Sequence, residues 1–448
     1  MIAPSLITVT TAPHVVRAHP GTVRTVVIPA EIANRPLLSL LPASLHASAS
    51  YSSWVTTDSH GVDTGLVGWG EAVRAEFVGP ERFSRAQRWW SSWIADLEID
   101  DPLGIPGSGP VAFTSFAFDP VPGTSVAIVP SVVIGRREGV TWLTVAATSS
   151  RSAQQIVANT LASMAAPAAV PTPSAGVTFT DGSLPVAQWR SAIDEAVRRI
   201  DVGELDKVVL ARDIVATADA PIDARYVLSR LASSYPSCWT FSVDGLLGAT
   251  PEMLVRRIGD TVTSRVLAGT VRRSSDATSD ASLAESLLAS AKDHAEHGYA
   301  VQSVARALAA HCTDLDVPTT PRLLRLANVQ HLATDVSGVL ADGAPALALA
   351  ASLHPTAAVC GTPTERAFAV IRELEGMDRG RYSGPVGWID SRGDGELGIA
   401  LRCAQMESDR QLRLFAGCGL VSGSEADSEL AESSAKFMPM RDALEAPQ

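Results

Sequence analysis

The sequence predicts an α+β fold in which large, mostly antiparallel sheets pack against helices. Short apolar runs bounded by Pro, Gly and Ser, such as TVRTVVIPA at 22–30 and TSVAIVPSVVIG at 124–135, indicate strands. Other segments have helical spacing, and Trp189, Ile193 and Ile200 fall on one stripe. Strand-like runs follow one another with helices between the groups, which is typical of antiparallel meanders packed with helices.

A linker-like stretch rich in Ala and Pro, SMAAPAAVPTPSAG at 163–176, divides the chain. We expect an N-terminal portion, 1–176, and a catalytic portion, 177–448, that belong to one fold. The N-terminal portion mixes short strands with a helical segment near 81–98. The later elements are expected, in order, as a helix over 184–205, strands over 207–215, 238–243, 246–257 and 261–269, a long helix over 280–311, a helix over 345–354, strands over 385–390, 395–406 and 412–421, and a last helix over 424–444.

Composition excludes several classes of partner. The 448 residues carry a net charge of −12, which argues against nucleic acid and anionic membranes. No apolar run reaches membrane length, and the N-terminus lacks the basic start and apolar core of a signal peptide. Five scattered cysteines without a C-x-x-C pair indicate unpaired thiols in the cytoplasm. We expect a monomer, because no heptad or apolar helix face is left unassigned.

The segment GELDKVVLAR, 203–212, places a lysine on an apolar face. In a strand, Lys207 points to the same side as Leu205, Val209 and Ala211. A lysine withdrawn from water favours its neutral form, which can act as a general base. The alternative is a strand-edge lysine whose stem covers apolar surface while its ammonium reaches water. The pattern alone leaves both interpretations open.

Two strand ends carry further polar groups. Glu252 follows a proline, and a carboxyl kept protonated by an apolar pocket can act as a general acid. A glutamate exposed in a turn is the alternative. In VLAGTVRR, Gly269 permits close approach of the backbone to a ligand, and Thr270 offers a hydroxyl and an N–H. An ordinary strand end with a glycine turn would explain this second pattern equally well.

Acidic residues recur at helical spacing on two of the expected helices. The KDHAEH segment carries Glu296, and the last helix lines up Glu425, Glu429, Glu432 and Lys436 on one stripe. Acids this close repel one another unless a cation joins them, and a hard cation such as Mg²⁺ takes carboxylate ligands. A solvated acidic face is the alternative for both helices.

The C-terminal strands offer groups that bind anions. Tyr382 and Arg402 can both reach a carboxylate, which arginine binds bidentately. In the run AGCGL, Gly417 and Gly419 bring backbone N–H groups that can serve as donors. The alternative for Arg402 is a surface arginine at a strand end.

Taken together and in this order, the motifs resemble those of the chorismate-utilising enzymes. The segments that carry the resemblance are KVVLAR, PEMLVRR, LAGTVRR, KDHAEH, NVQHL, HPTAAVCGTP, RYSGPVGW, GDGELGIALR and AGCGLVSGSEADSELAESSAK. They cover residues 185–445 densely, and GPVAFTSFAFDP at 109–120 extends the similarity more loosely to the N-terminal portion. The resemblance implies one large catalytic unit, chorismate as substrate and Mg²⁺ as cofactor.

The resemblance also implies a role for each matching residue. Lys207 would be the base that activates water, and Glu252 the acid that protonates the departing C4 hydroxyl. The other implied roles are Mg²⁺ binding by Glu296 and Glu432 with Glu429 acting through water, contact with the ring by Gly269, Thr270 and His331, contact with the enolpyruvyl carboxylate by Tyr382, Arg402, Gly417 and Gly419, and contact with the ligand's carboxylates by Lys436.

Within the family, the motifs are most similar to those of isochorismate synthases. Ala268 stands where aminodeoxychorismate synthases carry lysine. Ala358, expected in the substrate pocket, stands where anthranilate synthases carry histidine and salicylate synthases threonine. Ala357 replaces the usual proline, which should alter loop stiffness more than chemistry. The implied reaction adds water at C2 and removes the C4 hydroxyl, for menaquinone or siderophore biosynthesis. A salicylate synthase and a non-catalytic chorismate-binding relative remain as alternatives.

Overall fold

The computed structural model describes residues 21–43, 51–58, 60–165 and 170–445. The first 20 residues, on which the absence of a signal peptide was predicted, lie outside this range, as do residues 166–169 of the linker-like stretch. In the part that is described, no helix has both the length and the apolar character needed to cross a bilayer.

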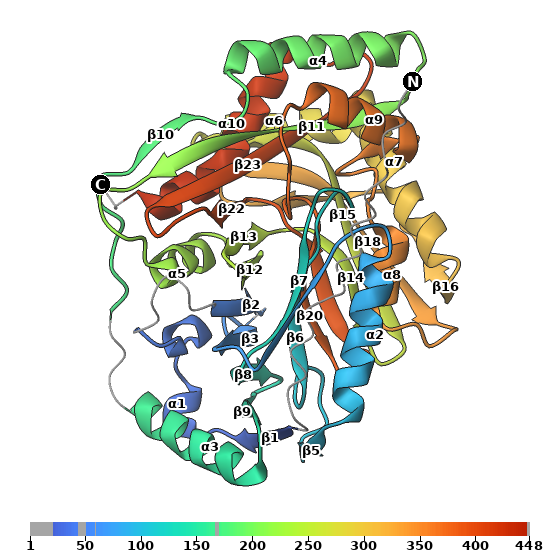
Figure 1. Cartoon of the computed structure of the whole chain (residues 1–448). Coiled ribbons are helices and arrows are strands. Elements are labelled where there is room, and N and C mark those ends of the chain that lie inside the picture. The colour runs from blue at the N-terminus through green and yellow to red at the C-terminus, as the bar shows by residue number, and fades with distance from the viewer. Residues whose placement is uncertain (1–20, 44–50, 59, 166–169, 446–448) are drawn as a thin grey trace, which may run out of the picture.

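Two large sheets form the body of the molecule (Figure 1). Among the described residues the first sheet has thirteen strands, in the spatial order β10 (Thr178–Asp181), β11 (Lys207–Thr217), β23 (Gln411–Leu420), β22 (Cys403–Met406), β13 (Leu246–Thr250), β12 (Trp239–Val243), β2 (Tyr51–Thr57), β3 (Asp63–Trp69), β8 (Val132–Arg137), β9 (Val140–Ala147), β1 (Thr22–Val27) and β5 (Glu98–Asp100), with β19 (Gly361–Thr362) also paired to β11. Ten described strands form the second sheet, in the order β16 (Cys312–Asp316), β18 (Val329–Leu340), β15 (Thr261–Arg272), β14 (Met253–Ile258), β21 (Gly395–Ile399), β20 (Pro385–Asp390), β6 (Val111–Ser115), β7 (Ser125–Val129) and β4 (Val73–Phe77), with β17 (Arg322–Arg325) paired to β18.

Both sheets combine strands from before and after the linker-like stretch. In the first sheet β2 pairs with β12, and in the second sheet β6 pairs with β20, both antiparallel. Most neighbouring strands are antiparallel, whereas β1 and β5 are parallel. The predicted α+β fold with large antiparallel sheets is confirmed.

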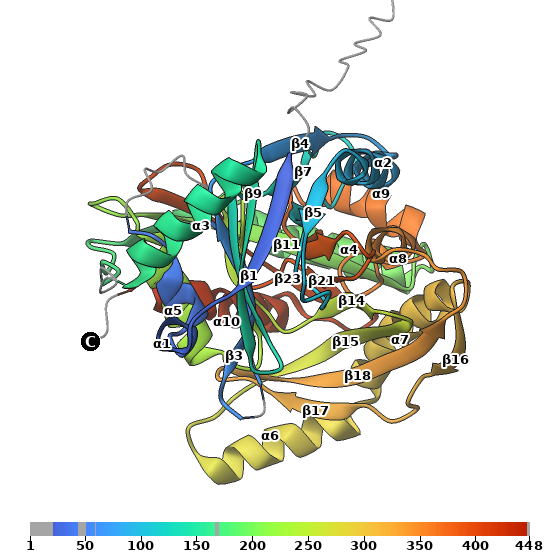
Figure 2. The same cartoon turned by 90° about the horizontal axis from the view of Figure 1, so that it is seen from below.

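Helices cover the outer faces of the two sheets (Figure 1 and Figure 2). The helices α3 (Ser150–Ala165), α5 (Ala224–Ser234) and α10 (Ala426–Leu444) pack on the first sheet with the short elements α1 (Ala30–Ala33) and η1 (Leu37–Leu40) nearby, while α2 (Arg82–Ala95), α6 (Ala277–Ala289), α7 (Ala291–Leu308) and α8 (Ala346–Leu353) pack on the second. Two further helices, α4 (Val186–Asp201) and α9 (Thr364–Leu374), lie against β11.

The inner faces of the sheets enclose an aromatic core. Trp54, Trp142 and Phe241 from the first sheet and Phe113 and Trp388 from the second belong to one buried cluster, and none exposes more than 1% of its surface. Large aromatic side chains bury much apolar area each, so this layer contributes strongly to holding the sheets together.

Two of the predicted strands were wrong in one respect: each crosses from one sheet to the other. The run 246–257 forms β13 in the first sheet and β14 in the second, and the run 395–406 forms β21 in the second sheet and β22 in the first. The crossings place Glu252 and Arg402 between the sheets. Ile399 N donates to Glu252 O at 3.1 Å, and Ala249 N donates to Arg402 O at 3.3 Å. The two crossings therefore lie side by side.

The long helix predicted over 280–311 was also wrong, because it is two helices. Ser290 has an extended backbone with ψ 110°, which ends α6, and its hydroxyl accepts a hydrogen bond from Asp293 N at 3.2 Å. This is an N-cap, which favours a new helix start. The break gives α7, the helix that carries Glu296, a direction of its own.

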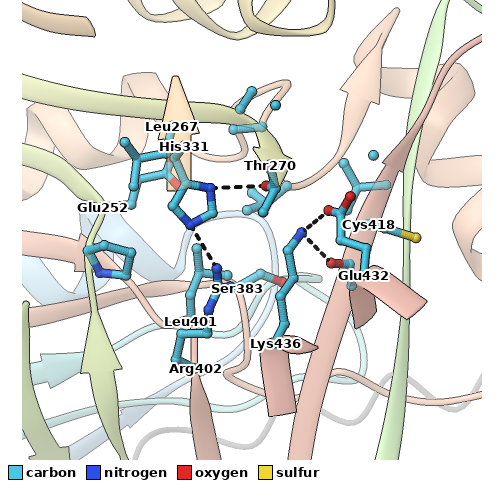
Figure 3. A pocket seen from close by; sticks show the side chains of 18 of the residues that line it. Glu252, Leu267, Thr270, His331, Ser383, Leu401, Arg402, Cys418, Glu432 and Lys436 are labelled. Atoms are coloured by element: carbon cyan, nitrogen blue, oxygen red, sulfur yellow. Dashed lines mark hydrogen bonds and ion pairs between the residues drawn. The ribbon is translucent and has the colours of Figure 1, made fainter. Parts of the chain in front are cut away.

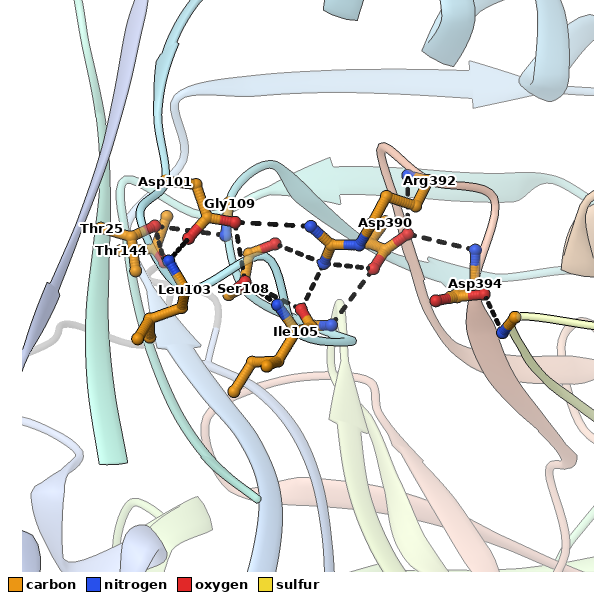
Figure 4. A network of polar contacts seen from close by, with 12 residues as sticks. Thr25, Asp101, Leu103, Ile105, Ser108, Gly109, Thr144, Asp390, Arg392 and Asp394 are labelled. Carbon is orange, nitrogen blue, oxygen red and sulfur yellow. Dashed lines mark hydrogen bonds and ion pairs between the residues drawn. The ribbon is translucent and has the colours of Figure 1, made fainter. Parts of the chain in front are cut away.

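A polar network fastens the loop after β5 to the turn between β20 and β21 (Figure 4). Asp390 accepts hydrogen bonds from Gly107 N at 3.2 Å and from Asp394 N at 3.1 Å. Arg392 Nη2 donates to Asp390 Oδ2 at 2.8 Å and to Ser108 O at 3.1 Å. Asp390 is 1% exposed, and burial raises its pKa. The network joins the N-terminal portion to the strands that approach the site.

Candidate active site

One cavity collects most of the residues that the sequence singled out. Twelve of the fourteen predicted site residues line it, namely Glu252, Gly269, Thr270, Glu296, His331, Ala358, Tyr382, Arg402, Gly417, Gly419, Glu432 and Lys436. The other two do not line it: Lys207 forms an ion pair with the lining residue Glu296, and Glu429 forms one with Lys292. The strand crossings, the ends of β15 and β23, and the helices α7 and α10 therefore meet at one place.

Lys207 is buried at the start of β11. It has no exposed surface, which excludes the alternative of a lysine reaching water from a strand edge. Its Nζ lies 3.1 Å from Glu296 Oε1 on α7. Gly419 faces this pair, and a Cβ there would overlap Glu296 Oε1 and lie 3.2 Å from Lys207 Cε. A glycine at this position of β23 leaves the space that the ion pair occupies.

Glu252 is a carboxyl group held away from water. It lies between β13 and β14, is 4% exposed, and its backbone N–H donates to Thr250 Oγ1 at 3.3 Å. Burial raises the pKa of Glu252 to about 8, although Lys207 and Arg402 act in the opposite direction. A carboxyl with this pKa carries a proton at neutral pH and can donate it, as a general acid must.

Three side chains form a hydrogen-bonded chain along one wall (Figure 3). His331 Nε2 lies 3.1 Å from Arg402 Nη2, and His331 Nδ1 lies 3.0 Å from Thr270 Oγ1. Because an arginine can only donate, Nε2 is the acceptor and Nδ1–H donates to Thr270. Burial, followed by the charge of Arg402, holds the pKa of His331 well below its usual value. The neutral imidazole leaves the Thr270 hydroxyl proton free to bind a ligand.

Arg402 adopts a backbone conformation that is costly for a residue with a Cβ. Its φ is +50°, in the left-handed region, at the point where the chain crosses between sheets. The side chain is 7% exposed, and its Nε is buried without a hydrogen-bond partner among the described residues. Strained backbone and an unsatisfied buried donor concentrate at ligand sites. The geometry suits an anionic ligand at this guanidinium.

Gly269 provides a second close approach. Its φ is +77°, and a β-bulge interrupts the pairing of β15 with β18 between Ala268 and Thr270. A Cβ at Gly269 would lie 3.1 Å from Asp293 Cβ on α7. Glycine at this bulge lets α7 pack closely beside Thr270, which lines the cavity.

Each of the three predicted metal ligands is paired with a lysine. Glu432 Oε1 lies 2.5 Å from Lys436 Nζ, and Glu429 Oε1 lies 3.3 Å from Lys292 Nζ. With the Lys207–Glu296 pair, three glutamate side chains of α7 and α10 each lie against a lysine side chain. Burial, followed by the charge of Glu432, raises the pKa of Glu429. In the described part of the chain, no three His, Cys, Asp or Glu side chains lie together as a ready metal site.

The acidic stripe on the last helix is shorter than predicted. The helix α10 begins at Ala426, so Glu425 is the N-cap residue, with extended backbone. Glu429, Glu432 and Lys436 follow on the helix. The carboxylate oxygens of Glu296 and Glu432, which border one cavity, are the donor type that Mg²⁺ takes, so the residues fit that ion chemically.

The remaining predicted groups also line the cavity. The Tyr382 ring stacks on Phe415 at 5.1 Å between centroids, and burial raises its pKa. Gly417 and Gly419 pair with Ala211 and Val209 across β23 and β11. Lys436 Nζ also donates to Gly417 O at 2.9 Å, so this lysine is fixed beside the glycine strand.

The cavity also contains residues that the sequence analysis did not select as site residues. These are Val209, Pro251, Leu267, Ala268, Val359, Arg379, Ser383, Leu401 and Cys418. Most of them adjoin selected residues in the chain. Arg379 differs from the other eight because its side chain is charged. The only signal for it in the sequence was its place at the start of the RGRYSG run.

A family model described as chorismate binding enzyme matches residues 18–445 of the chain. The chain belongs to this family. The resemblance drawn from the sequence motifs is therefore confirmed, and the match extends through the N-terminal portion, where the motifs were sparse.

Several relatives within the family carry names of one activity. Isochorismate synthase DhbC of Bacillus subtilis is 42% identical over 268 residues, which cover 57% of this chain and 67% of DhbC. The salicylate biosynthesis isochorismate synthase of Pseudomonas aeruginosa is 35% identical over 401 residues, 84% of this chain and 82% of that protein. The solved structure of MenF, the menaquinone-specific isochorismate synthase from Escherichia coli, aligns with a TM-score of 0.76 at 28% identity, covering 97% of this chain and 96% of its own.

Proposed function

We propose that the protein is an isochorismate synthase, which adds water at C2 of chorismate and removes the C4 hydroxyl. The observation that carries this proposal is the placement of two buried groups at one site: Lys207, with no exposed surface, and Glu252, whose raised pKa of about 8 keeps it protonated. The names of the relatives support the same reaction.

The two groups divide the proton transfers between them. Lys207 Nζ, in its neutral form and released from the ion pair with Glu296, takes a proton from the water that attacks C2, and Glu252 gives its proton to the C4 oxygen. The ring double bonds shift as the C4–O bond breaks, and the leaving group departs as water. One water enters and one leaves, so the reaction is an isomerisation. An acid and a base can work at the same pH when their different surroundings give them different pKa values.

The substrate's charges need local compensation, because the protein is acidic overall. Chorismate is a dianion and the chain carries a net charge of −12. Arg402 and Lys436 supply positive charge at the cavity, and the Nε of Arg402, which has no partner among the described residues, offers a donor in fixed position. Donors held in place before the substrate arrives stabilise charge that develops during the reaction.

We propose Mg²⁺ as the cofactor. Glu296 and Glu432 would hold it, with Glu429 acting through water, and the bound ion would supply positive charge for the ring carboxylate. The support is the chemistry of these carboxylates and the convergence of α7 and α10 on one cavity.

The test is product analysis with the purified full chain, chorismate and MgCl₂, followed by liquid chromatography. Accumulating isochorismate is the expected result, and its absence with excess EDTA would support the metal. Salicylate with one equivalent of pyruvate would show a salicylate synthase instead. Chorismate binding in calorimetry without any turnover would show a non-catalytic relative.

We further propose a monomer in the cytoplasm. The five cysteines are all free thiols, which suits a reducing compartment. Relatives named for menaquinone and for siderophore biosynthesis are both similar to this chain, so either pathway fits the reaction. Light scattering coupled to gel filtration would test the monomer: a mass near 46.9 kDa is expected, and twice that mass would contradict it.

A further inference from the structure

The strand that carries Lys207 has an unusual edge. One side of β11 pairs with β23 from Val208 to Thr217. On the other side, β19 pairs only at residues 207–208 and β10 only at residues 214–217. Among the described residues, no strand pairs with the segment between them, although it is buried. Buried backbone N–H and C=O groups need partners, so something else must supply them.

Three side chains form hydrogen bonds with the backbone of this unpaired segment of β11. Arg379 Nη2 donates to Val209 O at 2.8 Å. Ala211 N donates to Glu375 Oε1 at 2.6 Å, and Trp189 Nε1 donates to Ala211 O at 3.0 Å. All three side chains belong to residues that are at most 3% exposed. Side-chain groups therefore satisfy three backbone groups of this segment next to the active site, while Val209 N donates to Cys360 O at 2.8 Å and Gly182 N donates to Asp213 O at 3.2 Å.

Arg379 also connects β11 to two other walls of the cavity. Its Nη1 donates to Val359 O at 2.8 Å and to Ser383 Oγ at 3.1 Å. Val359 follows Ala358, and Ser383 follows Tyr382 with a φ of +56°. Val359 and Ser383 line the cavity together with Val209. One guanidinium thus joins three chain segments that border the same space.

Glu375 fixes the orientation of this guanidinium. Arg379 Nε and Nη2 donate to Glu375 Oε2 and Oε1 at 2.8 and 2.6 Å, a bidentate pair between residues four apart in the chain. The guanidinium also lies 4.2 Å over the Phe118 ring. All five N–H groups of Arg379 are used, so none is left for a substrate.

We propose that Arg379, oriented by Glu375, is a positioning residue that holds the Lys207 strand, the Ala358 loop and the Tyr382 turn in register around the substrate. The proposal rests on the proposed function above. A lysine at position 379 would keep the charge but lose the planar fork, so it could not bond all three segments at once. A displacement of about 1 Å at the reacting groups can reduce the rate about 100-fold.

The test compares R379K with W189F as a matched control. W189F removes one hydrogen bond from the same strand edge but none from the Val359 or Ser383 segments. We expect R379K to lower kcat by about 100-fold with a KM for chorismate within about threefold, and W189F to lower kcat by less than about fivefold. Calorimetry should still show one chorismate bound per chain in both variants. A variant that had lost its folded structure would bind less.

A second readout is independent of turnover. Hydrogen exchange of the peptide covering residues 208–213 should be faster in R379K than in the wild type. A wild-type protein that makes no isochorismate would refute the proposed function. The role of Arg379 would still be tested in that case, by comparing hydrogen exchange and chorismate binding between R379K and the wild type. A folded R379K variant with the kcat of W189F, or with unchanged exchange in this peptide, would overturn the proposal.

The variant E375Q guards against failure of R379K to fold. This substitution keeps the shape of the side chain and one acceptor oxygen, but it removes the negative charge and one of the two acceptors for Arg379. We expect kcat to fall by about tenfold, between the values of W189F and R379K, since the guanidinium is held less firmly. A kcat equal to that of the wild type in E375Q would contradict the role of this pair.

Discussion

Lys207 Nζ and Glu296 Oε1 form an ion pair of 3.1 Å that joins the start of β11 to α7. The two residues come from distant parts of the chain, and the lysine has no exposed surface while the glutamate side chain is 14% exposed. A buried ammonium is costly unless a carboxylate accompanies it, so the pair explains how a lysine can occupy an apolar strand face. The proposed base and a proposed metal ligand are thereby in direct contact.

Replacing Lys207 by alanine should abolish hydration of chorismate. Loss of a general base lowers rates by about 10²- to 10⁴-fold, and we expect a loss of about 1,000-fold in kcat for K207A. Binding of Mg²⁺, measured by calorimetry in the absence of substrate, should persist because Glu296 and Glu432 remain. Near-normal activity of K207A would refute the role of Lys207 as the base.

A methyl group at Gly419 should disrupt the same ion pair. The added Cβ of G419A would overlap Glu296 Oε1, so either the glutamate or β23 must move. We expect kcat to fall by about 100-fold, as reacting groups are displaced. The matched control is G298A on α7, where a Cβ meets nothing within 4 Å. G298A should retain full activity and gain about 1 kcal/mol of stability, as Gly-to-Ala changes in helices do. Equal activity of G419A and the wild type would contradict the packing argument.

The activity should fall as pH rises through the pKa of Glu252. The carboxyl is protonated below about pH 8 and loses its proton above that value, and only the protonated form can act as the acid. We therefore expect kcat/KM to fall on the alkaline side with an apparent pKa near 8. The variant E252Q should be inactive. Its affinity for chorismate should not change with pH across this range. A wild-type profile that stays flat from pH 7 to pH 9 would exclude Glu252 as the acid.

The same shift predicts how stability depends on pH. The pKa of Glu252 is raised from 4.5 in the unfolded chain to about 8 in the folded protein. Its contribution to stability is fully present below pH 4.5 and is lost as pH rises to about 8, since the folded state binds the extra proton. Between these pH values, the free energy of unfolding of the wild type should decrease relative to that of E252Q. Urea titrations at pH 5 and pH 8 measure the difference, and parallel values for the two proteins would contradict it.

The backbone strain at Arg402 can be separated from its side-chain chemistry. R402A and R402G both remove the guanidinium and should both raise the KM for chorismate by at least about tenfold, the value of one charge-assisted hydrogen bond. The two variants differ only by a Cβ at a φ of +50°. Glycine tolerates this conformation, so R402G should be more stable than R402A by about 1 kcal/mol. Thermal denaturation tests this order, and a less stable R402G would show that no strain is stored there.

Neutralising Glu432 should weaken the proposed metal site. E432Q keeps the size of the side chain and removes one negative charge, so more Mg²⁺ should be needed for half-maximal activity, by about tenfold. The control is E425Q, which changes an exposed residue before the same helix. E425Q should keep the wild-type metal dependence. An unchanged Mg²⁺ requirement in E432Q would remove Glu432 from the metal site.

Local patterns predicted which face of a segment is buried more reliably than where a segment ends. The alternation around Lys207 identified its apolar face, because that property depends only on neighbours in the strand. The run 395–406 has an equally apolar pattern on both sides of its crossing between sheets, so nothing local marks the change at Arg402. The break between α6 and α7 had a visible signal in Ser290, a good N-cap residue, but the surrounding helical spacing concealed it.

Long-range partners were beyond the reach of periodicity. No local pattern pairs Lys207 with Glu296 or directs three of the five donors of Arg379 to Val209, Val359 and Ser383. The resemblance to a family predicted a shared site for twelve residues that do line one cavity. It could do so because it depends on the order of motifs along the whole chain. It did not reveal that lysines accompany all three acidic residues, which depends on side-chain geometry.

The pairing of β11 with β23 has a consequence for biosynthesis. Val208 lies opposite Leu420, so the first of these strands leaves the ribosome roughly 200 residues before its partner, a delay of about 10–40 s at usual rates of translation. Throughout that interval the strand that bears Lys207 has an open edge, the kind of surface that chaperones shield and that otherwise aggregates. Catalysis can begin only when β23 has been delivered, so the nascent chain cannot consume substrate before residue 420 has been synthesised.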